Sequence, residues 1–274
     1  MIPSIFDRQL YLARQQKASG ANAALVVHIA EDLADRLSVI NHQFEKVLLI
    51  AQNGEAYATV LKGSGKCVEI EIRQPVVGED LELQLQHFDA VFSLMDMHCV
   101  NDVPGTLAQC SRALKPNGLF MMAGFAGETL SELRQAWLSG ESEISGGASL
   151  RIAPMIGTRE MGGLLQRAGL ALPVSDVDHA TLRYADPLAM MREIKTFGFS
   201  NPLLERRKSF TSQRMLAAAL DYYQNHFADA DGRVRATLDV LWAMAWKPHD
   251  SQPKPLKPGS AKARLADVLR KLDD

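Results

Sequence analysis

Short apolar runs that alternate with helix-type patterns constrain the fold of this chain more than any other feature. Val47–Ile50 is a continuous apolar run and Phe88–Leu94 is a second, largely apolar one, as expected of strands that are buried on both faces of a parallel sheet. Residues 68–72 alternate with period two, which predicts a strand nearer an edge. Helix patterns occur at 104–114, 129–138 and 158–168. The alternation predicts a doubly wound α/β sheet.

The last strands of this sheet are expected to run antiparallel. Residues 237–246 are rich in β-branched and aromatic side chains, which predicts a late strand. Helix patterns at 187–197 and 212–227 separate this strand from the segment 180–184. Because this long insertion follows an otherwise regular alternation, we predict that the two strands pair antiparallel at one edge of the sheet.

We divide the chain into a central domain and two extensions. Apolar positions recur every fourth residue within 4–37, which predicts a helical start. Prolines after residue 247 predict a stiff linker, and apolar positions within 261–272 predict a short basic amphipathic helix. The expected parts are an N-terminal helical extension at 1–45, an α/β domain at 46–247, and a linker with a C-terminal helix at 248–274.

Charge, cysteine content and hydropathy exclude several function classes. The 30 basic and 32 acidic residues give a formal net charge of −2, which creates no field that would gather nucleic acid. Cys67, Cys99 and Cys110 form no CxxC pair, so we expect neither a disulfide framework nor a bound metal. The longest apolar stretch, Leu119–Ala126, is shorter than the about 20 residues of a membrane-spanning helix. Since no secretory signal is recognisable, we expect a cytoplasmic protein.

Several segments spread along the chain carry a family resemblance. They are Ile5–Arg8 with Arg14–Ala18, His98–Pro104, Gly127–Arg134, Met215–Ala219 and Trp246–Lys247. With these segments the chain resembles the class I S-adenosylmethionine-dependent methyltransferases and, more specifically, the methyltransferase-like complex I assembly factor five family of mitochondria and its bacterial relatives. The resemblance implies a Rossmann-like sheet with an antiparallel terminal strand pair, and a role in maturing a respiratory complex by hydroxylating an arginine. Because the family motif begins almost at residue 1, we expect a bacterial relative.

The loop after the first predicted strand departs from the pattern of such methyltransferases. Their first strand ends in an acidic residue and a loop D-x-G-x-G-x-G, whose glycines let the backbone approach the cofactor. Here Leu49 replaces the acid, Ala51, Asn53 and Glu55 stand at the glycine places, and Gly54 is out of register. The Glu55 carboxylate would lie near that of the methionine part, and two like charges about 4 Å apart cost about 4 kcal/mol. This weakens binding roughly thousandfold, so we expect weak or no S-adenosylmethionine binding, with Ala51, Asn53 and Gly54 as positional candidates.

The interval between Glu71 and Phe88 is also short. Its 16 residues cannot hold a full helix, a third strand and their turns, because one crossover alone takes at least about 10–12 residues. We therefore predict no full-length helix there and a shortened wall for the adenine. Glu71 is a candidate to bind the ribose hydroxyls, or else a solvated side chain of an edge strand. Asp80 is a candidate for the adenine amine, and Met95 is a positional candidate after the strand at 88–94.

Two polar residues near the carboxyl end of a central strand are the catalytic candidates. His98 and Asp102 lie at the edge where ligands bind in open α/β sheets. His98 is either a general base or a packed histidine, and Asp102 either a catalytic residue or the N-cap of the helix that begins near Pro104. A further alternative concerns Asn53-Gly54, which could form a type I′ hairpin turn in place of a strand-to-helix loop.

Two function hypotheses follow. In the first, the chain is an enzyme that uses S-adenosylmethionine, or another cosubstrate in the same cleft, on a protein side chain or a small acceptor. In the second, it is a methyltransferase-fold protein that has lost the cofactor and acts as a binding or assembly component with a protein partner. The rewritten loop favours the second. A nicotinamide dehydrogenase is disfavoured because G-x-G-x-x-G does not follow the first strand.

Overall fold

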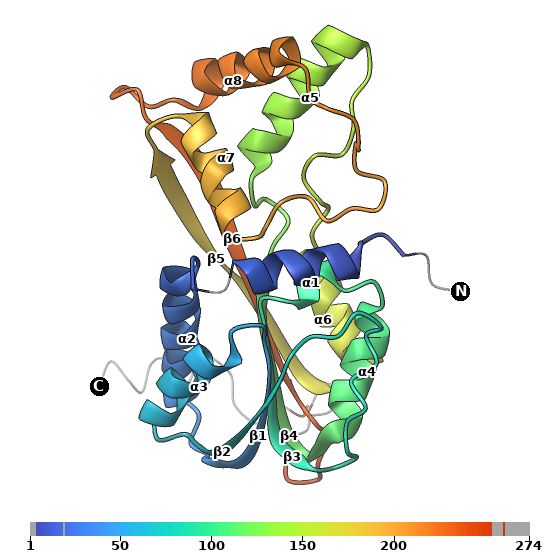
Figure 1. Cartoon of the computed structure of the whole chain (residues 1–274). Coiled ribbons are helices and arrows are strands. Elements are labelled where there is room, and N and C mark those ends of the chain that lie inside the picture. Colours follow the sequence, from blue (N-terminus) through green and yellow to red (C-terminus); the bar gives the residue numbers. More distant parts are fainter. Residues whose placement is uncertain (1–3, 19, 254–259, 261–274) are drawn as a thin grey trace.

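The structure is a computed structural model that describes residues 4–18, 20–253 and 260 (Figure 1). Its helices and strands alternate along most of the chain. In order they are α1 (Arg8–Lys17), α2 (Ala23–Ser38), β1 (Phe44–Ile50), α3 (Gly54–Gly63), β2 (Cys67–Arg73), β3 (Phe88–Leu94), the short 3-10 helix η1 (Met97–Cys99), α4 (Val103–Ala113), β4 (Leu114–Phe125), α5 (Ser131–Ser145), α6 (Thr158–Arg167), β5 (Ala171–Tyr184), α7 (Pro187–Thr196), α8 (Gln213–Phe227) and β6 (Val234–Trp246).

The described strands form one sheet with the order β2-β1-β3-β4-β6-β5. β1 pairs in parallel with β2 and β3, and β3 pairs in parallel with β4. β6 runs antiparallel to both of its neighbours, and Ala180 of β5 lies opposite Leu238 of β6. The predicted fold class, the edge position of β2 and the antiparallel terminal pair are therefore confirmed.

Helices cover both faces of the parallel strands, which explains why these strands are continuously apolar. On one face α2 and α3 pack against the sheet, and Ile29 joins a core cluster with Leu49 of β1. On the other face α4 and α6 pack, and Leu107 joins a second cluster with Leu48. Successive side chains of β1 thus point into two different cores, and both cores require apolar residues.

β5 and β6 continue beyond the parallel strands and carry a third core. The pairing of β4 with β6 ends at Phe125 opposite Val240, whereas β5 and β6 stay paired as far as Tyr184 opposite Val234. α5, α7 and α8 lie around this extension in the upper part of Figure 1, where Tyr223 is fully buried. The insertion between the two last strands therefore lies beyond the carboxyl edge of the parallel strands.

Two further expectations concern connections. Residues 74–87 contain neither a helix nor a strand, which confirms that the segment between β2 and β3 lacks a full-length helix. Asn53 is the N-cap of α3, which begins at Gly54. The alternative of a hairpin turn at these two residues is wrong, because β1 is followed by a helix and pairs with parallel strands only.

The carboxyl end of the chain is described in part. Residues 248–253 form turns after β6, whereas most of the expected linker and the expected helix at 261–272 lie outside the described residues. Among the helices that the structure describes, none has the length and apolar character needed to cross a membrane.

Candidate functional site at the carboxyl edge of the sheet

α1 crosses the carboxyl edge of the parallel strands and places two buried side chains there. Arg8 donates from Nη1 and Nη2 to the carboxylate of Asp96, just after β3, at 2.7 and 3.1 Å. Its Nε lies 3.6 Å from the carboxylate of Glu79. One turn later, the Tyr11 hydroxyl donates to the carbonyl of Met95 at 2.8 Å. Because Arg8 is 4% exposed, this edge is closed by a buried ion pair.

The surroundings of Arg8 keep its guanidinium charged. Burial is the largest single effect and lowers the pKa of Arg8, but the Asp96 carboxylate, with smaller contributions from Tyr11 and Glu79, raises that pKa, and the net change is upward. The same burial raises the pKa of the Tyr11 hydroxyl well above its usual value. The edge therefore carries a permanently charged guanidinium and a neutral phenol.

The connection between β2 and β3 folds over the same edge and is fastened by Glu79. Its carboxylate accepts hydrogen bonds from the backbone N–H groups of Asn101 and Asp102 at 2.7 and 2.8 Å, and from the Asn101 side-chain amide at 3.2 Å. Arg8 also donates to the carbonyl of Val76 at 3.4 Å. The connection is therefore tied both to α1 and to the segment that starts α4.

The loop after β1 serves packing between helices and strands. Ala51 is fully buried in the core shared with α2 and α3. A Cβ atom at Gly54 would lie 2.2 Å from Cγ2 of Ile72 in β2, so this glycine permits the close approach of α3 to β2. Asn53 donates from its side-chain amide to the buried Asn22, at the N-terminus of α2, at 3.3 Å. Ala51, Asn53 and Gly54 thus contact neighbouring elements of the chain itself.

The remaining positional candidates are not all brought together. Glu71 accepts a hydrogen bond from Nε of Arg73 on the same strand at 3.0 Å, so its carboxylate is engaged at the end of β2. Met95 directly follows β3, where its N–H donates to the carbonyl of Ala123 in β4 at 2.8 Å. It has a positive φ of 56° and supplies the carbonyl that binds the tyrosine hydroxyl described above. Asp80 is exposed and lines a separate small hollow with Arg112. The structure therefore groups the loop, Glu71 and Met95 at one edge but leaves Asp80 outside that group.

The two catalytic candidates have different surroundings. His98, in η1, is buried beside Phe125 with ring centroids 4.8 Å apart, and its Nε2 lies 3.4 Å from the Tyr11 hydroxyl. Burial, with a smaller contribution from Arg8, lowers the pKa of His98 to about 3, so the imidazole is neutral. Asp102 accepts a hydrogen bond from the N–H three residues later at 2.8 Å and caps α4. The capping alternative therefore describes what the Asp102 carboxylate does in this structure.

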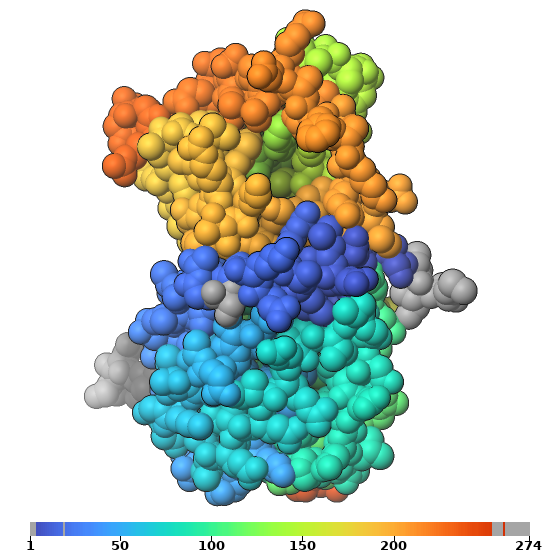
Figure 2. Space-filling model, viewed as in Figure 1, coloured from blue at the N-terminus to red at the C-terminus, as the bar shows by residue number. Residues whose placement is uncertain are grey.

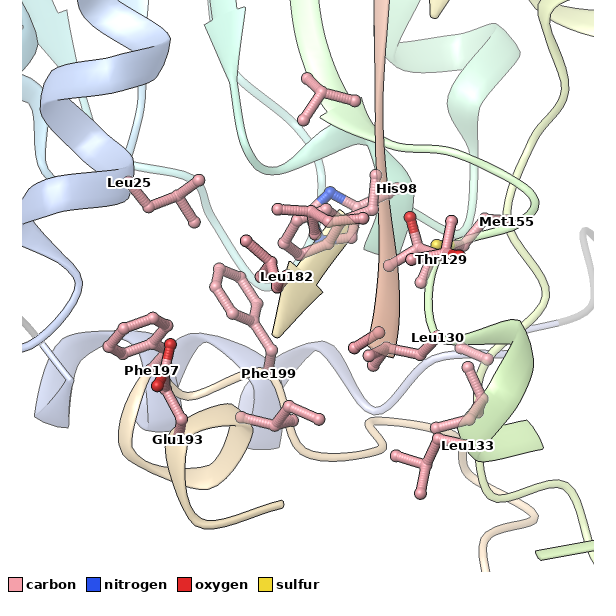
Figure 3. A pocket seen from close by; sticks show the side chains of 18 of the residues that line it. Leu25, His98, Thr129, Leu130, Leu133, Met155, Leu182, Glu193, Phe197 and Phe199 are labelled. Carbon is pink, nitrogen blue, oxygen red and sulfur yellow. The ribbon is translucent and has the colours of Figure 1, made fainter. Parts of the chain in front are cut away.

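A large cavity adjoins His98. It measures about 1570 Å³ and lies between α1, α2, the extension of β5 and β6, and the helices α5 and α7. Figure 3 shows apolar side chains that converge on it from separate elements, among them Leu25, Leu133, Leu182 and Phe199. The cavity opens where Figure 2 shows a hollow between α7, α1 and the orange segment after residue 200. This space lies beside the closed edge and shares Tyr11 with it.

Sequence reasoning missed Arg8, Tyr11 and Glu79. The first lies in a segment that carries the family resemblance, but an arginine in a short polar helix reads as a solvated residue. Glu79 belongs to a connection without a pattern, and the cavity is assembled from elements far apart in the chain. The one available signal was the shortness of the connection between β2 and β3. A connection this short leaves the sheet edge to be covered by another segment of the chain, which is α1.

The fold and the position of this edge define a class. A model described as "Methyltransferase domain" matches residues 37–122, and the sheet order is that of a Rossmann-like methyltransferase fold. A solved protein of Bacillus halodurans, described as a candidate methyltransferase, aligns with 80% of this chain and 98% of its own, with a TM-score of 0.50 and 17% sequence identity. At that identity the likeness concerns the fold alone.

Within this class, sequence relatives define the family. The mitochondrial arginine-hydroxylase NDUFAF5 of Rattus norvegicus is 33% identical over a gapped alignment of 292 positions, which covers 97% of this chain and 84% of that protein. The protein of the same name from Danio rerio is 40% identical over 192 residues, which cover 70% of this chain and 60% of its own length. The chain therefore belongs to the NDUFAF5 arginine-hydroxylase family.

Proposed function

We propose that the chain is a methyltransferase-fold factor in the assembly or modification of a protein complex, and that it does not hold S-adenosylmethionine in the position usual for the fold. The observation that carries this proposal is the buried ion pair of Arg8 and Asp96, with Glu79 beside it, at the sheet edge where ligands of open α/β folds bind. A ligand that entered this edge would leave one of these charges buried without a partner, which costs about 3–5 kcal/mol.

The residues of the loop after β1 do not fit S-adenosylmethionine. Its methionine part needs a close backbone approach that only glycine permits, and side chains stand at all three places, on Ala51, Asn53 and Glu55. Gly54, the remaining glycine, is used against Ile72. No catalytic step of this chain is therefore assigned to this cofactor.

A protein partner is the second part of the proposal. The relatives are named for an activity on arginine, and the family resemblance implies the maturation of a respiratory complex. We infer that the partner presents an arginine side chain on a protein surface. A cytoplasmic location, a bacterial source and the absence of a nucleic-acid partner remain predictions.

Titration with S-adenosylmethionine tests the cofactor part. We expect no saturable heat of binding and no rise in the melting temperature at about 1 mM ligand. If the dissociation constant were about 10 μM, that concentration would stabilise the fold by about 2.7 kcal/mol, which a thermal scan resolves. Micromolar binding would overturn the proposal and move the enzyme hypothesis to first place.

An arginine-modifying enzyme is the second candidate, and one observation favours it. Asp32, Asp35 and Asp178 lie at one end of the cavity, where burial raises the pKa of Asp32; Asp178 and Asp35 raise it further, whereas His28 and Arg36 lower it. Carboxylates of this kind pair with a guanidinium, as Asp178 does with that of Arg36. Incubating the chain with an arginine-containing peptide, dioxygen and a two-electron reductant, and measuring the peptide mass, tests this candidate. A gain of one oxygen atom, with the second oxygen atom of dioxygen reduced to water, supports it, and an unchanged mass counts against it.

A further inference from the structure

We propose that the cavity beside His98 binds a small amphipathic anion, with a long apolar body and a carboxylate head of the fatty-acid type. Its volume of about 1570 Å³ exceeds the about 300–1,000 Å³ of ordinary small-molecule pockets. This site adjoins the closed sheet edge and shares Tyr11 with it, but the loop after β1 and Glu71 do not line it. The inference therefore holds or fails independently of S-adenosylmethionine binding by that loop.

The apolar body is assigned from the side chains that face the cavity. Leu25 of α2, Leu133 of α5, Leu182 of β5 and Phe199 contribute to its wall (Figure 3). Leu182 is 37% exposed although it lies in the interior of a strand pair, so its exposed surface faces this hollow. An apolar wall of this kind gains most from an apolar ligand that displaces water from it.

The head group is assigned from the charge at the opening after residue 200. Five basic residues line this end of the cavity: Arg14, Arg151, Arg206, Arg207 and Lys208. Lys208 is exposed and, within the part of the chain that the structure describes, forms no hydrogen bond or ion pair. Burial lowers the pKa of Arg14, and Arg206 beside it lowers that pKa further. Cations therefore crowd together here at an electrostatic cost that an anion would relieve.

Two carboxylates balance only part of this charge. Glu141 pairs with Arg151 and lies 3.7 Å from Arg207, and Asp7 pairs with Arg206 at 3.2 Å. Glu193 of α7 also lines the cavity and accepts a hydrogen bond from the Tyr184 hydroxyl at 3.2 Å. The five cations outnumber these three carboxylates. A bound carboxylate would accept hydrogen bonds from the guanidinium and ammonium groups that remain.

The opposite end of the cavity fixes the orientation of the anion. Asp32, Asp35 and Asp178 lie at that end, where Arg36 pairs with Asp178 at 2.9 Å. An anionic head would be repelled there and attracted to the end that carries Lys208. The ligand body would then run from the basic opening along the apolar wall.

Three probes of equal chain length test the assignment: dodecanoate, dodecan-1-ol and dodecyltrimethylammonium, each titrated into the full chain below its solubility limit and its micelle concentration. Trp137 lines the cavity, so tryptophan fluorescence reports binding and calorimetry gives the stoichiometry. We expect dodecanoate to bind one to one with micromolar affinity, and the other two at least tenfold more weakly. Equal or tighter binding of the alcohol or the ammonium probe, or no binding of dodecanoate, would overturn the proposal.

Two substitutions with matched controls locate the site. Leu182→Asp should weaken dodecanoate binding at least tenfold, whereas Leu85→Asp, at a residue 71% exposed outside the cavity, should not. Lys208→Glu should weaken it at least threefold, whereas Lys62→Glu in α3 should leave it unchanged. Melting curves confirm that each variant is folded. Wild-type affinity in folded Leu182→Asp would refute the cavity as the site, and wild-type affinity in Lys208→Glu would refute the head-group assignment.

Discussion

Replacing Arg8 with methionine tests the ion pair that closes the sheet edge. Methionine keeps the apolar stem of the side chain but leaves the carboxylate of Asp96, which is 6% exposed, without its charged partner. Removing one member of a buried pair costs about 3–5 kcal/mol. We therefore expect Arg8→Met to lower the free energy of unfolding by that amount. In urea this appears as a lower midpoint with an unchanged m value. The melting temperature should fall by about 2–4 °C for each kcal/mol lost.

A double-mutant cycle completes the experiment. The variant that combines Arg8→Met with Asp96→Leu should recover most of the lost stability, because a buried pair replaced by apolar residues is often neutral or better. Arg159→Met, at an exposed arginine of α6, should change stability by no more than about 0.5 kcal/mol. A loss below about 1 kcal/mol in Arg8→Met would place the pair among hydrated surface salt bridges and refute the closed edge.

Other positions give independent predictions. The free energy of unfolding should fall by about 2 kcal/mol between pH 8 and pH 5 through His98, because its folded-state pKa is lowered to about 3 while the unfolded chain takes up a proton near pH 6.5. His98→Phe should remove most of this loss in urea unfolding, and the same pH profile in the variant would contradict the role of His98. Gly54→Ala should cost about 1–3 kcal/mol because its Cβ would meet Ile72, and adding Ile72→Ala should reduce that cost; equal losses with and without the second change would count against the packing argument. Asp102→Ala should cost about 0.5–2 kcal/mol through the lost α4 cap, measured by urea unfolding, and a neutral result would remove the capping role.

The sheet could be predicted because its central strands are buried on both faces and must therefore be apolar. Val47–Ile50 is buried on both faces, so only apolar residues are tolerated, and that pattern is visible in one sequence. The antiparallel pair was predictable for a different reason: the long helical insertion before β6 breaks the regular alternation. Both signals depend on local composition.

The site could not be predicted in the same way because its residues act through contacts between distant segments. Arg8 is buried only because α1 crosses the sheet edge and meets Asp96, 88 positions later in the chain. Gly54 was interpreted as a remnant of a cofactor loop, and the structure uses it for contact with Ile72. Neither contact leaves a periodic pattern, so the residue types alone give no sign of it.

The contact between the N-terminal segment and residues near 200 also limits when this part of the fold can form. Phe6 forms a bridge with Leu203, and the backbone N–H of Asp7 donates to the carbonyl of Pro202 at 2.8 Å. During synthesis this segment must wait for about 200 further residues, which takes roughly 10–40 s at about 5–20 residues per second. During that interval the nascent chain already contains its central strands, but the bridge between Phe6 and Leu203 has not formed. Any molecule that binds the open edge has its best access during translation, before the two distant segments meet.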